Sequence, residues 1–338
     1  MLRVLHILPH RGGGAETYID LLERLPDVAH ARLALSASRT PGGAARSVPR
    51  RYGTLARAAR AADVVHVHGD AAAILALPLR PAVFTTHGLH LLRRAHGVAG
   101  AAVRAGVGAA VAGGRATLCT SASECGELRR LLPARLHGRL EVVANGIELP
   151  PADPARRAAA RAALGLTDRD VAGLYLGELE ERKDPLTAVR AARAAGPPFV
   201  LLVAGAGPLS AAVRSEAGTS VRVLGFRDDP EALLAAADVF VMPSRREGLS
   251  FAVLEAMGHG LAMVVADGPG NPEAVGDAGI VLPGGDVAGF AAAFRELARD
   301  GARRADLGRR ARERVAERFT VERLREGVRA AYARAQGA

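Results

Sequence analysis

Residues 237–258 read ADVFVMPSRREGLSFAVLEAMG, and their pattern indicates a parallel α/β fold. An aliphatic run at 238–242 leads into a short polar loop, and an apolar segment of helical period follows from 251 to 258. A buried strand that passes through a small loop into a buried helix is the repeating unit of parallel α/β sheets. In such sheets ligands bind where strands end, because helix N-termini present free N–H groups there.

The same strand-to-helix unit recurs along the chain on both sides of this stretch. In the first half we expect strands at 2–8, 31–36, 63–68, 82–87, 116–120 and 140–144. In the second half we expect strands at 171–177, 198–204, 221–224, 238–242, 262–266 and 279–282. A proline-rich segment at 149–154 separates the two series, so the sequence predicts two doubly wound α/β domains in tandem.

The predicted domains are residues 1–150 and residues 151–318. A last amphipathic helix is expected within 319–338, and in a two-domain protein such a helix could cross back to the first domain. No short-period repeat interrupts this pattern.

Composition narrows the function class. The 338 residues carry 45 basic and 35 acidic side chains, a formal net charge of +10, which suits either solubility or an acidic partner. No basic run with interleaved aromatics is present, which argues against nucleic-acid binding. The two cysteines lack metal-binding or redox spacing, and no apolar run reaches the ~18 residues of a membrane span. We therefore expect a cytoplasmic protein.

Two carboxylates in the quoted stretch are candidates for ligand binding. Glu255 interrupts an apolar helix, where a carboxylate is costly unless something hydrogen-bonds it. A ribose or sugar diol would do so, and pairing with a nearby arginine is the alternative. Glu247 lies in the loop before the helix, and Ser250 is the expected N-cap.

A third candidate follows the strand at 171–177. Lys183 precedes Asp184, an expected cap, and Pro185, which suits the first helical position. An ammonium at this corner could meet a phosphate, and a solvated lysine is the alternative. The glycines at 205 and 207 are better explained as a tight turn than as a ligand loop.

These segments together resemble the retaining glycosyltransferases of family GT4. Residues 243–257 resemble the E-x7-E signature of that family, with Glu247 and Glu255 at the required spacing. Further similar segments span both halves: Gly13-Gly14-Ala15-Glu16, Thr86-His87-Gly88, Asn145-Gly146-Ile147, Gly177-x-Leu179-x-x-x-Lys183, Gly205-x-Gly207-Pro208 and Asn271-Pro272-Glu273. One position departs from the pattern, because the usual arginine is Glu178 here. Arg182 could compensate, or Glu178 could point away.

The resemblance implies a GT-B fold, in which two Rossmann-like domains enclose a cleft, and a nucleotide diphosphate sugar (UDP or GDP) as donor. It implies that Glu255 holds the ribose, Lys183 the diphosphate and Glu247 the transferred sugar. The remaining implied donor-binding positions are Gly13, Gly14, Arg182, Ser250 and Phe251. His87 would approach the sugar, so the implied catalytic set is Glu247, His87 and Lys183. The expected activity is transfer of a hexosyl group to an acceptor hydroxyl with retention of configuration.

Other functions stay open from the sequence. They are a nucleotide-sugar epimerase or phosphorylase on the same fold, and a non-enzymatic binder of anionic surfaces. No cofactor and no metal are expected: Asp168-Arg169-Asp170 suits a turn, and His66-x-His68 with His87 and His90 lacks a completing carboxylate or cysteine. The acceptor could be a saccharide, a lipid-linked sugar or a natural product. The basic stretch 89–94 suits either a soluble acceptor or peripheral contact with the inner membrane face.

Overall fold

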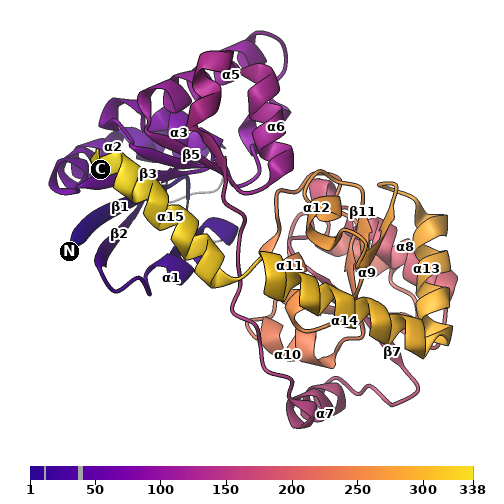
Figure 1. Ribbon diagram of the computed structural model, residues 1–338. Coiled ribbons are helices and arrows are strands. Elements are labelled where there is room, and N and C mark those ends of the chain that lie inside the picture. Colours follow the sequence, from indigo (N-terminus) through magenta and orange to yellow (C-terminus); the bar gives the residue numbers. More distant parts are fainter. Residues whose placement is uncertain (11–12, 37–40, 338) are drawn as a thin grey trace. The chain divides into compact units, whose positions relative to one another are not determined.

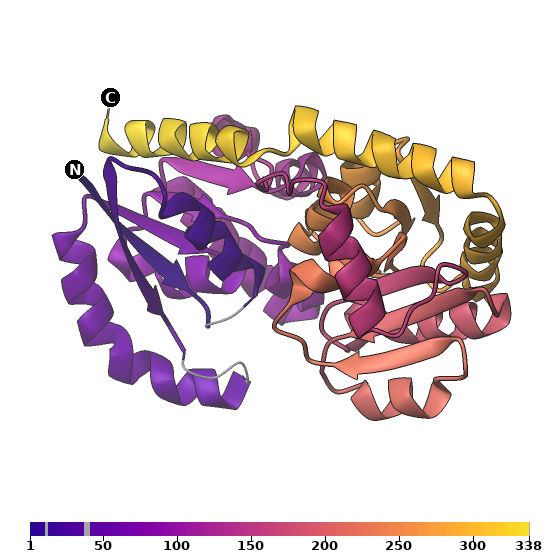
Figure 2. The same ribbon diagram turned by 90° about the horizontal axis from the view of Figure 1, so that it is seen from below.

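The computed structural model describes residues 1–10, 13–36 and 41–337, with the backbone alone for 41–50. Its contacts divide the chain into two compact units. The first comprises Met1–Gly146 together with Val321–Ala338, and the second comprises Ile147–Thr320. The last helix, α15 (Val321–Gln336), therefore belongs to the first unit. Figures 1 and 2 both show it along the sheet of that unit.

The first unit is built on a six-stranded parallel sheet in the order β2-β1-β3-β4-β5-β6. Its strands are β1 (Leu2–Leu8), β2 (Val28–Ala34), β3 (Val64–His68), β4 (Val83–Thr85), β5 (Ala116–Cys119) and β6 (Leu140–Val142). Its other helices are α1 (Gly14–Leu22), α2 (Pro41–Ala61), α3 (Asp70–Leu75), α4 (His90–Arg94), α5 (Gly97–Gly113) and α6 (Ala122–Leu131), with short 3₁₀ turns at Leu77–Leu79 and Ala134–Arg139.

The two faces of this sheet differ in chemistry. One face packs aliphatic side chains such as Leu5, Val65 and Val67 against α2, α3, α5 and α6, and forms the main core of the unit. The alternate residues of the same strands point to the opposite face, because side chains along a strand alternate. On that face β1 and β3 carry His6 and His66, which are register partners and fully buried.

The second unit contains a six-stranded parallel sheet in the order β12-β11-β10-β7-β8-β9. Its strands are β7 (Val171–Leu176), β8 (Phe199–Ala204), β9 (Val221–Gly225), β10 (Val239–Met242), β11 (Ala262–Ala266) and β12 (Gly279–Leu282). Its helices are α7 (Pro154–Ala163), α8 (Pro185–Ala195), α9 (Ser210–Glu216), α10 (Pro230–Ala236), α11 (Phe251–Gly258), α12 (Asn271–Val275), α13 (Val287–Arg299) and α14 (Gly301–Arg318), with a 3₁₀ turn at Glu181–Lys183.

The four inner strands of the second unit, β7, β8, β10 and β11, are buried on both faces. Phe199 on β8 stacks on Phe294 of α13 with ring centroids 4.4 Å apart, and α8 covers the same face. On the other face α14 contacts α11 and β11. This two-sided cover explains why the strands are near-continuous runs of Val, Leu, Ala and Met rather than alternating patterns.

In both sheets, the direction in which the chain adds successive strands reverses at one point. In the second unit the chain proceeds outward from β7 through β8 to β9 and then returns to β10 on the other side of β7. In the first unit the same reversal lies between β1 and β3. Loops leaving the carboxyl ends of strands at such a switch point diverge, which leaves room for a ligand.

The expected α/β architecture is confirmed, with small shifts at the ends of elements. The second strand covers Val28–Ala34 rather than 31–36. Its partly exposed side chains, such as Arg32, pair with acidic residues on the surface and conceal the strand pattern. The long helix Pro41–Ala61 was not predicted, because its glycines and prolines at 41–49 resemble a loop.

Candidate functional site

The quoted stretch lies at the switch point of the second unit. The loop of Pro243–Leu249 leaves β10, and the loop of Gly177–Asp184 leaves its neighbour β7. A backbone hydrogen bond of 3.0 Å from the Arg245 amide to the Arg182 carbonyl joins the two loops. Residues that are more than 60 positions apart in the sequence thus share one edge of the sheet.

Glu247 is the centre of the charge cluster at this edge, and only 6% of it is exposed. Its Oε1 atom lies 2.6 Å from Nζ of Lys183 and 2.9 Å from Nη1 of Arg182. The hydroxyl of Ser244, which is fully buried, donates to the same oxygen at 3.1 Å. Three of the predicted donor-binding side chains, Glu247, Lys183 and Arg182, are therefore brought together.

Arg182 is surrounded by carboxylates. Besides Glu247, its guanidinium lies 2.6 Å from Glu180 and 3.6 Å from Glu178, the residue that replaces the usual arginine of the family. Glu178 is half-exposed, and the pairing shows that its side chain is turned toward Arg182. The arginine expected to compensate for Glu178 is thus already engaged by acidic neighbours. Arg246, in the loop after β10, is exposed and forms no ion pair within the described part of the chain.

Two expected helix caps differ from the sequence prediction. Asp184 occupies the N-cap position of α8 in a left-handed conformation (φ 49°), but its side chain makes no capping bond. Instead its Oδ2 accepts a hydrogen bond of 2.9 Å from Arg245, which the sequence alone could not place nearby. Ser250 is the N-cap residue of α11, yet its hydroxyl also makes no capping bond. The first amides of α11, beginning at Phe251, consequently have no acceptor within the helix.

Glu255 has a different environment from Glu247. It lies in the middle of α11 among buried neighbours, and it has no hydrogen-bond or ion-pair partner for its carboxylate among the residues that the structure describes. Burial, with a smaller contribution from the charge of Glu231, raises the pKa of Glu255 to about 7. The expected alternative, a pairing with an arginine, is not found in the described chain.

Glycines allow the loops of this edge to approach one another. A Cβ at Gly270 would lie 1.9 Å from the carbonyl oxygen of Gly248, and one at Gly205 would lie 1.9 Å from that of Gly177. Gly205 and Gly207 thus serve the close packing of the loops after β7 and β8, in agreement with the predicted turn.

In the first unit, His87 follows β4 in an unusual backbone turn. His87, Gly88 and Leu89 have consecutive φ values of 48°, 109° and 49°. Left-handed conformations are uncommon outside glycine and cluster at functional sites. Arg93 stabilises the turn by donating to the Gly88 carbonyl at 2.8 Å. The turn directs the ring of His87 back to β3, where its Nε2 lies 2.9 Å from Nδ1 of His68.

Gly13 and Gly14 begin α1. Gly13 is the N-cap residue with φ 91°, a conformation that favours glycine, and no side-chain cap is present. The first backbone amides of α1 are therefore not capped by a side chain, and this arrangement suits a phosphate.

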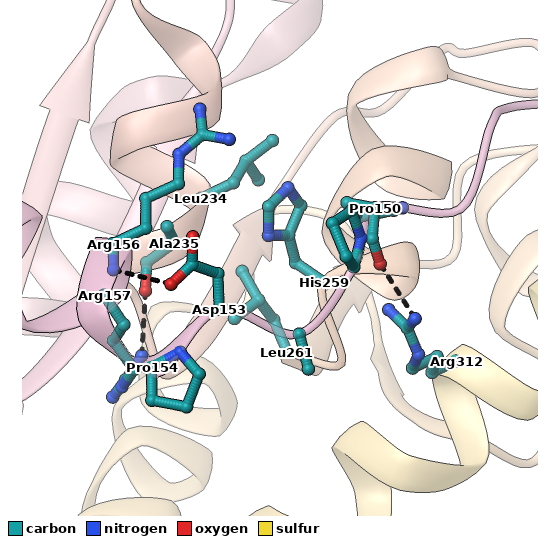
Figure 3. Close-up of a pocket in the computed structure, with 12 residues that line it drawn as sticks. Pro150, Asp153, Pro154, Arg156, Arg157, Leu234, Ala235, His259, Leu261 and Arg312 are labelled. Atoms are coloured by element: carbon teal, nitrogen blue, oxygen red, sulfur yellow. Dashed lines mark hydrogen bonds between the residues drawn. The ribbon is translucent and has the colours of Figure 1, made fainter.

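A pocket of about 280 Å³ lies elsewhere on the second unit (Figure 3). His259 and Leu261, which precede β11, line it together with Asp153 and Arg312. Its charged groups are engaged within the protein: Arg312 donates to the Pro150 carbonyl, and Asp153 accepts from the Arg156 amide. The pocket is at the edge where strands begin, opposite the edge that carries Glu247, so it is separate from the candidate site.

Two other sequence features have structural explanations. Asp170 accepts hydrogen bonds from the Thr167 amide and hydroxyl at 2.7 and 2.8 Å, which agrees with the turn expected for Asp168-Arg169-Asp170. His6, His66 and His68 have ring nitrogens within 4.8 Å of one another, a grouping that sequence reasoning missed. The sequence contained a signal for this grouping, because His66 and His68 are alternate residues of one predicted strand and His6 lies in another. None of the described helices combines the length and apolar character that crossing a bilayer requires.

Family models match both halves of the chain. Residues 12–149 match the model "Glycosyltransferase Family 4", and residues 172–300 match "Glycosyl transferases group 1". Among curated proteins, the chain is 36% identical over 168 residues to D-inositol 3-phosphate glycosyltransferase from Mycobacterium sp. (strain KMS), which covers 45% of this chain and 38% of that protein. It is 31% identical over 205 residues to a GDP-mannose-dependent mannosyltransferase of Corynebacterium glutamicum that acts on a monoacylated phosphatidylinositol monomannoside, covering 55% and 54%. The chain thus aligns with about half or less of these relatives' length.

Solved structures show the same fold over the whole chain. The Anabaena protein HepE in complex with UDP superposes with a TM-score of 0.80 at 16% identity, covering 98% of this chain and 100% of that one. Sucrose-phosphate synthase from Thermosynechococcus elongatus gives 0.81 at 21% identity, covering 98% of each chain. With two parallel six-stranded sheets matching these GT-B structures and both family models aligned, the chain belongs to glycosyltransferase family 4.

Proposed function

We propose that the protein transfers a hexosyl group from a nucleotide diphosphate sugar to an acceptor hydroxyl, with retention of configuration. The observation that carries this proposal is Glu255: a largely buried carboxylate at the ligand edge of the sheet that lacks a partner in the described chain and whose pKa is raised to about 7. Such a group is destabilising unless a ligand satisfies it. A ribose diol offers two adjacent donors to one carboxylate.

The diphosphate is proposed to bind at the start of α11. The amides that follow Ser250 have no helical acceptor, and the helix dipole favours negative charge there. Lys183 lies at the same edge and supplies the compact positive charge that stabilises a departing diphosphate. No nucleophile is assigned, and the acceptor proton is proposed to pass to the donor phosphate.

Donor binding would replace the ion pair between Lys183 and Glu247 by contacts of each residue with the donor. In the structure Lys183 is neutralised by Glu247 at 2.6 Å. A bound diphosphate would compete for Lys183, while hydroxyls of the transferred sugar would replace the ammonium on Glu247. Because Arg182 also lies 2.9 Å from Glu247, that carboxylate stays compensated during the exchange. The first unit is proposed to contribute His87 to the sugar and the amides at Gly13 and Gly14 to the diphosphate, as the family resemblance implies.

The relatives support a nucleotide sugar as donor without deciding its base. The name of the Corynebacterium relative specifies GDP-mannose, whereas HepE was crystallised with UDP and with UDP-glucose. The acceptor of this chain is proposed only as a hydroxyl compound. The proposed location is the cytoplasm, with peripheral membrane contact if the acceptor is a lipid.

The test is a thermal-shift screen with UDP, GDP, ADP and TDP and their common sugars, followed by turnover with the donor that binds. A true donor at many times its dissociation constant should stabilise the protein by about 3 kcal/mol. Glu255→Gln should weaken nucleotide binding, because the amide offers one uncharged acceptor oxygen where the ionised carboxylate offers two. Glu247→Ala should abolish turnover with a smaller change in nucleotide affinity.

Four results would contradict the proposal, the first three as a whole and the last in its stereochemistry. Kinetics unchanged in both variants would remove Glu247 and Glu255 from the site. Conversion of the donor to an isomer without any acceptor would indicate an epimerase. Binding to anionic surfaces that vanishes at moderate salt, with no nucleotide affinity at all, would indicate a non-enzymatic binder. Inversion at the anomeric carbon, read by NMR of the product, would overturn the retaining mechanism alone.

A further inference from the structure

Four histidines form one hydrogen-bonded chain in the first unit. Nδ1 of His30 on β2 lies 2.8 Å from Nε2 of His6 on β1. Nδ1 of His6 lies 2.9 Å from Nε2 of His68 on β3, and Nδ1 of His68 lies 2.9 Å from Nε2 of His87. The chain crosses three strands and ends at the turn after β4. His30 is half-buried, and His6 and His68 are fully buried.

Each contact joins Nδ1 of one ring to Nε2 of the next. A neutral imidazole carries one N–H and one lone pair, so a hydrogen bond between two rings needs exactly one proton in that contact. When both nitrogens of a ring are engaged, the tautomer of that ring determines the tautomer of its neighbour. The four rings therefore share one tautomer: either all carry the proton on Nε2, or all carry it on Nδ1.

The rings are held neutral by their surroundings. Burial lowers the pKa of His6 and His68 well below its usual range, and that of His87 to about 3, and repulsion from neighbouring basic side chains disfavours a second proton further. The ring of Tyr18 on α1 contacts His87 edge-on, with centroids 4.8 Å apart. At the His30 end of the row of histidines, Glu23 and Arg32 act on His30 with opposite charges. The four histidines thus couple the directions of their hydrogen bonds and carry no charge.

His87 is the end of the chain that can meet a ligand. Its Nε2 is engaged by His68, whereas its Nδ1 has no hydrogen-bond partner among the described residues. The residue is only partly buried and lies beyond the carboxyl end of β4, the edge where ligands of parallel sheets bind.

We propose that His68, His6 and His30 are positioning residues that hold His87 in the tautomer common to all four rings, so that its Nδ1 offers the donor sugar one defined hydrogen-bonding role. The inference rests on the proposed function, because it assigns the ligand that Nδ1 meets. Which nitrogen of a histidine carries the proton is set by the bond that the other nitrogen makes, and here that bond is relayed over three further rings.

A metal ion is the competing explanation, since His6, His66 and His68 could each offer a nitrogen. Both nitrogens of His66 are already engaged, by the Tyr332 hydroxyl at 2.9 Å and the Thr85 hydroxyl at 2.7 Å. A metal would also displace the His6–His68 hydrogen bond. The contacts therefore favour the relay over a metal.

The first test needs no variant. Long-range ¹H–¹⁵N correlation spectra of the ¹⁵N-histidine-labelled protein identify the tautomer of each neutral ring. We expect one common tautomer for His30, His6, His68 and His87. Different tautomers within the chain, or a stoichiometric metal in the purified protein, would overturn the proposal.

The second test breaks the chain at His6. His6→Leu removes the middle link, so His87 should become a mixture of tautomers, whereas His6→Gln restores one donor and one acceptor. With the donor found to turn over, His6→Leu should lower kcat about tenfold, the size of effect seen for partners that orient a functional histidine, with donor KM within about twofold. His6→Gln should recover most of kcat.

His66→Gln is the matched control, because His66 lies on the same buried face but outside the chain. It should leave the tautomer of His87 unchanged. An equal effect of His66→Gln and His6→Leu on that tautomer and on kcat would reduce the role of His6 to packing and overturn the proposal. If no donor turns over at all, the proposed function fails, while the spectra of the parent still decide whether the relay exists.

Discussion

Two glutamates at the required family spacing occupy opposite electrostatic environments. Glu247 is satisfied within the protein by Lys183, Arg182 and Ser244. Glu255 is a desolvated carboxylate that lacks a partner in the described chain. The ion-pair partners of a buried carboxylate compensate its charge, whereas an unpaired carboxylate gains most from a ligand. This difference agrees with separate proposed roles on the sugar and the ribose.

Glu255 should make the stability of the protein depend on pH. Folding raises its pKa from 4.5 to about 7, so the folded protein binds more protons than the unfolded chain in this window. The free energy of unfolding should therefore fall as pH rises from 4.5 to about 7, by about 3 kcal/mol. Glu255→Gln should remove this decrease, which urea denaturation at pH 5 and pH 7.5 measures. An identical pH dependence in parent and variant would contradict the prediction.

Glu178 should weaken the attraction for a diphosphate. It is half-exposed and pairs with Arg182, so it places a negative charge at the ligand edge. Glu178→Arg should tighten nucleotide diphosphate binding several-fold at low salt, and added salt should reduce the gain because exposed charges are screened. Isothermal titration at two salt concentrations measures this.

Glu181→Arg is the matched control for Glu178→Arg, since it changes the net charge equally at an exposed position three residues further along the same loop. An equal gain from both variants would assign the effect to overall charge rather than to the place of Glu178.

At the scale of elements, close loop packing brings the site residues together. The loop after β7 carries Lys183, and the loop after β8 passes so near that only glycine fits at position 205. The two strands that these loops leave, β7 and β8, are parallel neighbours in the sheet. The turn after β8 has no charged side chain of its own, yet it supports the loop that does.

Gly205→Ala should destabilise the second unit. The new Cβ would lie 1.9 Å from the Gly177 carbonyl oxygen, and φ of 148° disfavours a side chain. We expect a loss of more than about 1 kcal/mol in the free energy of unfolding, together with weaker nucleotide binding. Gly126→Ala is the control, because its Cβ would have ordinary contacts within helix α6, and it should stabilise by about 0.5–1 kcal/mol. Chemical denaturation distinguishes the two outcomes.

At the scale of the whole molecule, the C-terminal helix packs on the sheet that the N-terminal part of the chain forms. Helix α15 belongs to the first unit, and it contacts β3, β4 and β5. Arg325 donates to the Leu21 carbonyl at 2.9 Å, and the buried Tyr332 reaches His66. The last helix therefore covers the face of the sheet that carries the histidines.

Tyr332→Phe should weaken the packing of α15 on the face of the sheet that carries the histidines. The change leaves Nδ1 of the fully buried His66 without its partner at 2.9 Å, which costs about 1–3 kcal/mol. Hydrogen–deuterium exchange should show reduced protection in β3 and α15. Arg334→Ala, which removes an ion pair with Glu141 at an exposed position, should cost less than about 1 kcal/mol. Equal loss of protection in both variants would contradict the role of the tyrosine.

Much of the fold and part of the site were predictable from local patterns. The alternation of strands and helices depends on residues close in sequence, and so do the loop position of Glu247 and the helix position of Glu255. The roles of Lys183, His87 and the Gly13-Gly14 loop stay predictions. Asp184 and Ser250 occupy the predicted N-cap positions, but neither makes a capping bond, because a side chain can find a better partner or none in the folded protein.

Local sequence patterns therefore specify the series of elements and the edge of the sheet at which each polar residue lies. Which charges meet depends on how the elements pack. The tertiary structure pairs Glu247 with Lys183 from the loop of another strand, and it aligns His6, His68 and His87 from three separate segments. The physical reason is that neighbouring strands of a parallel sheet are joined by long crossovers, so their partners are distant in sequence and no local pattern specifies them.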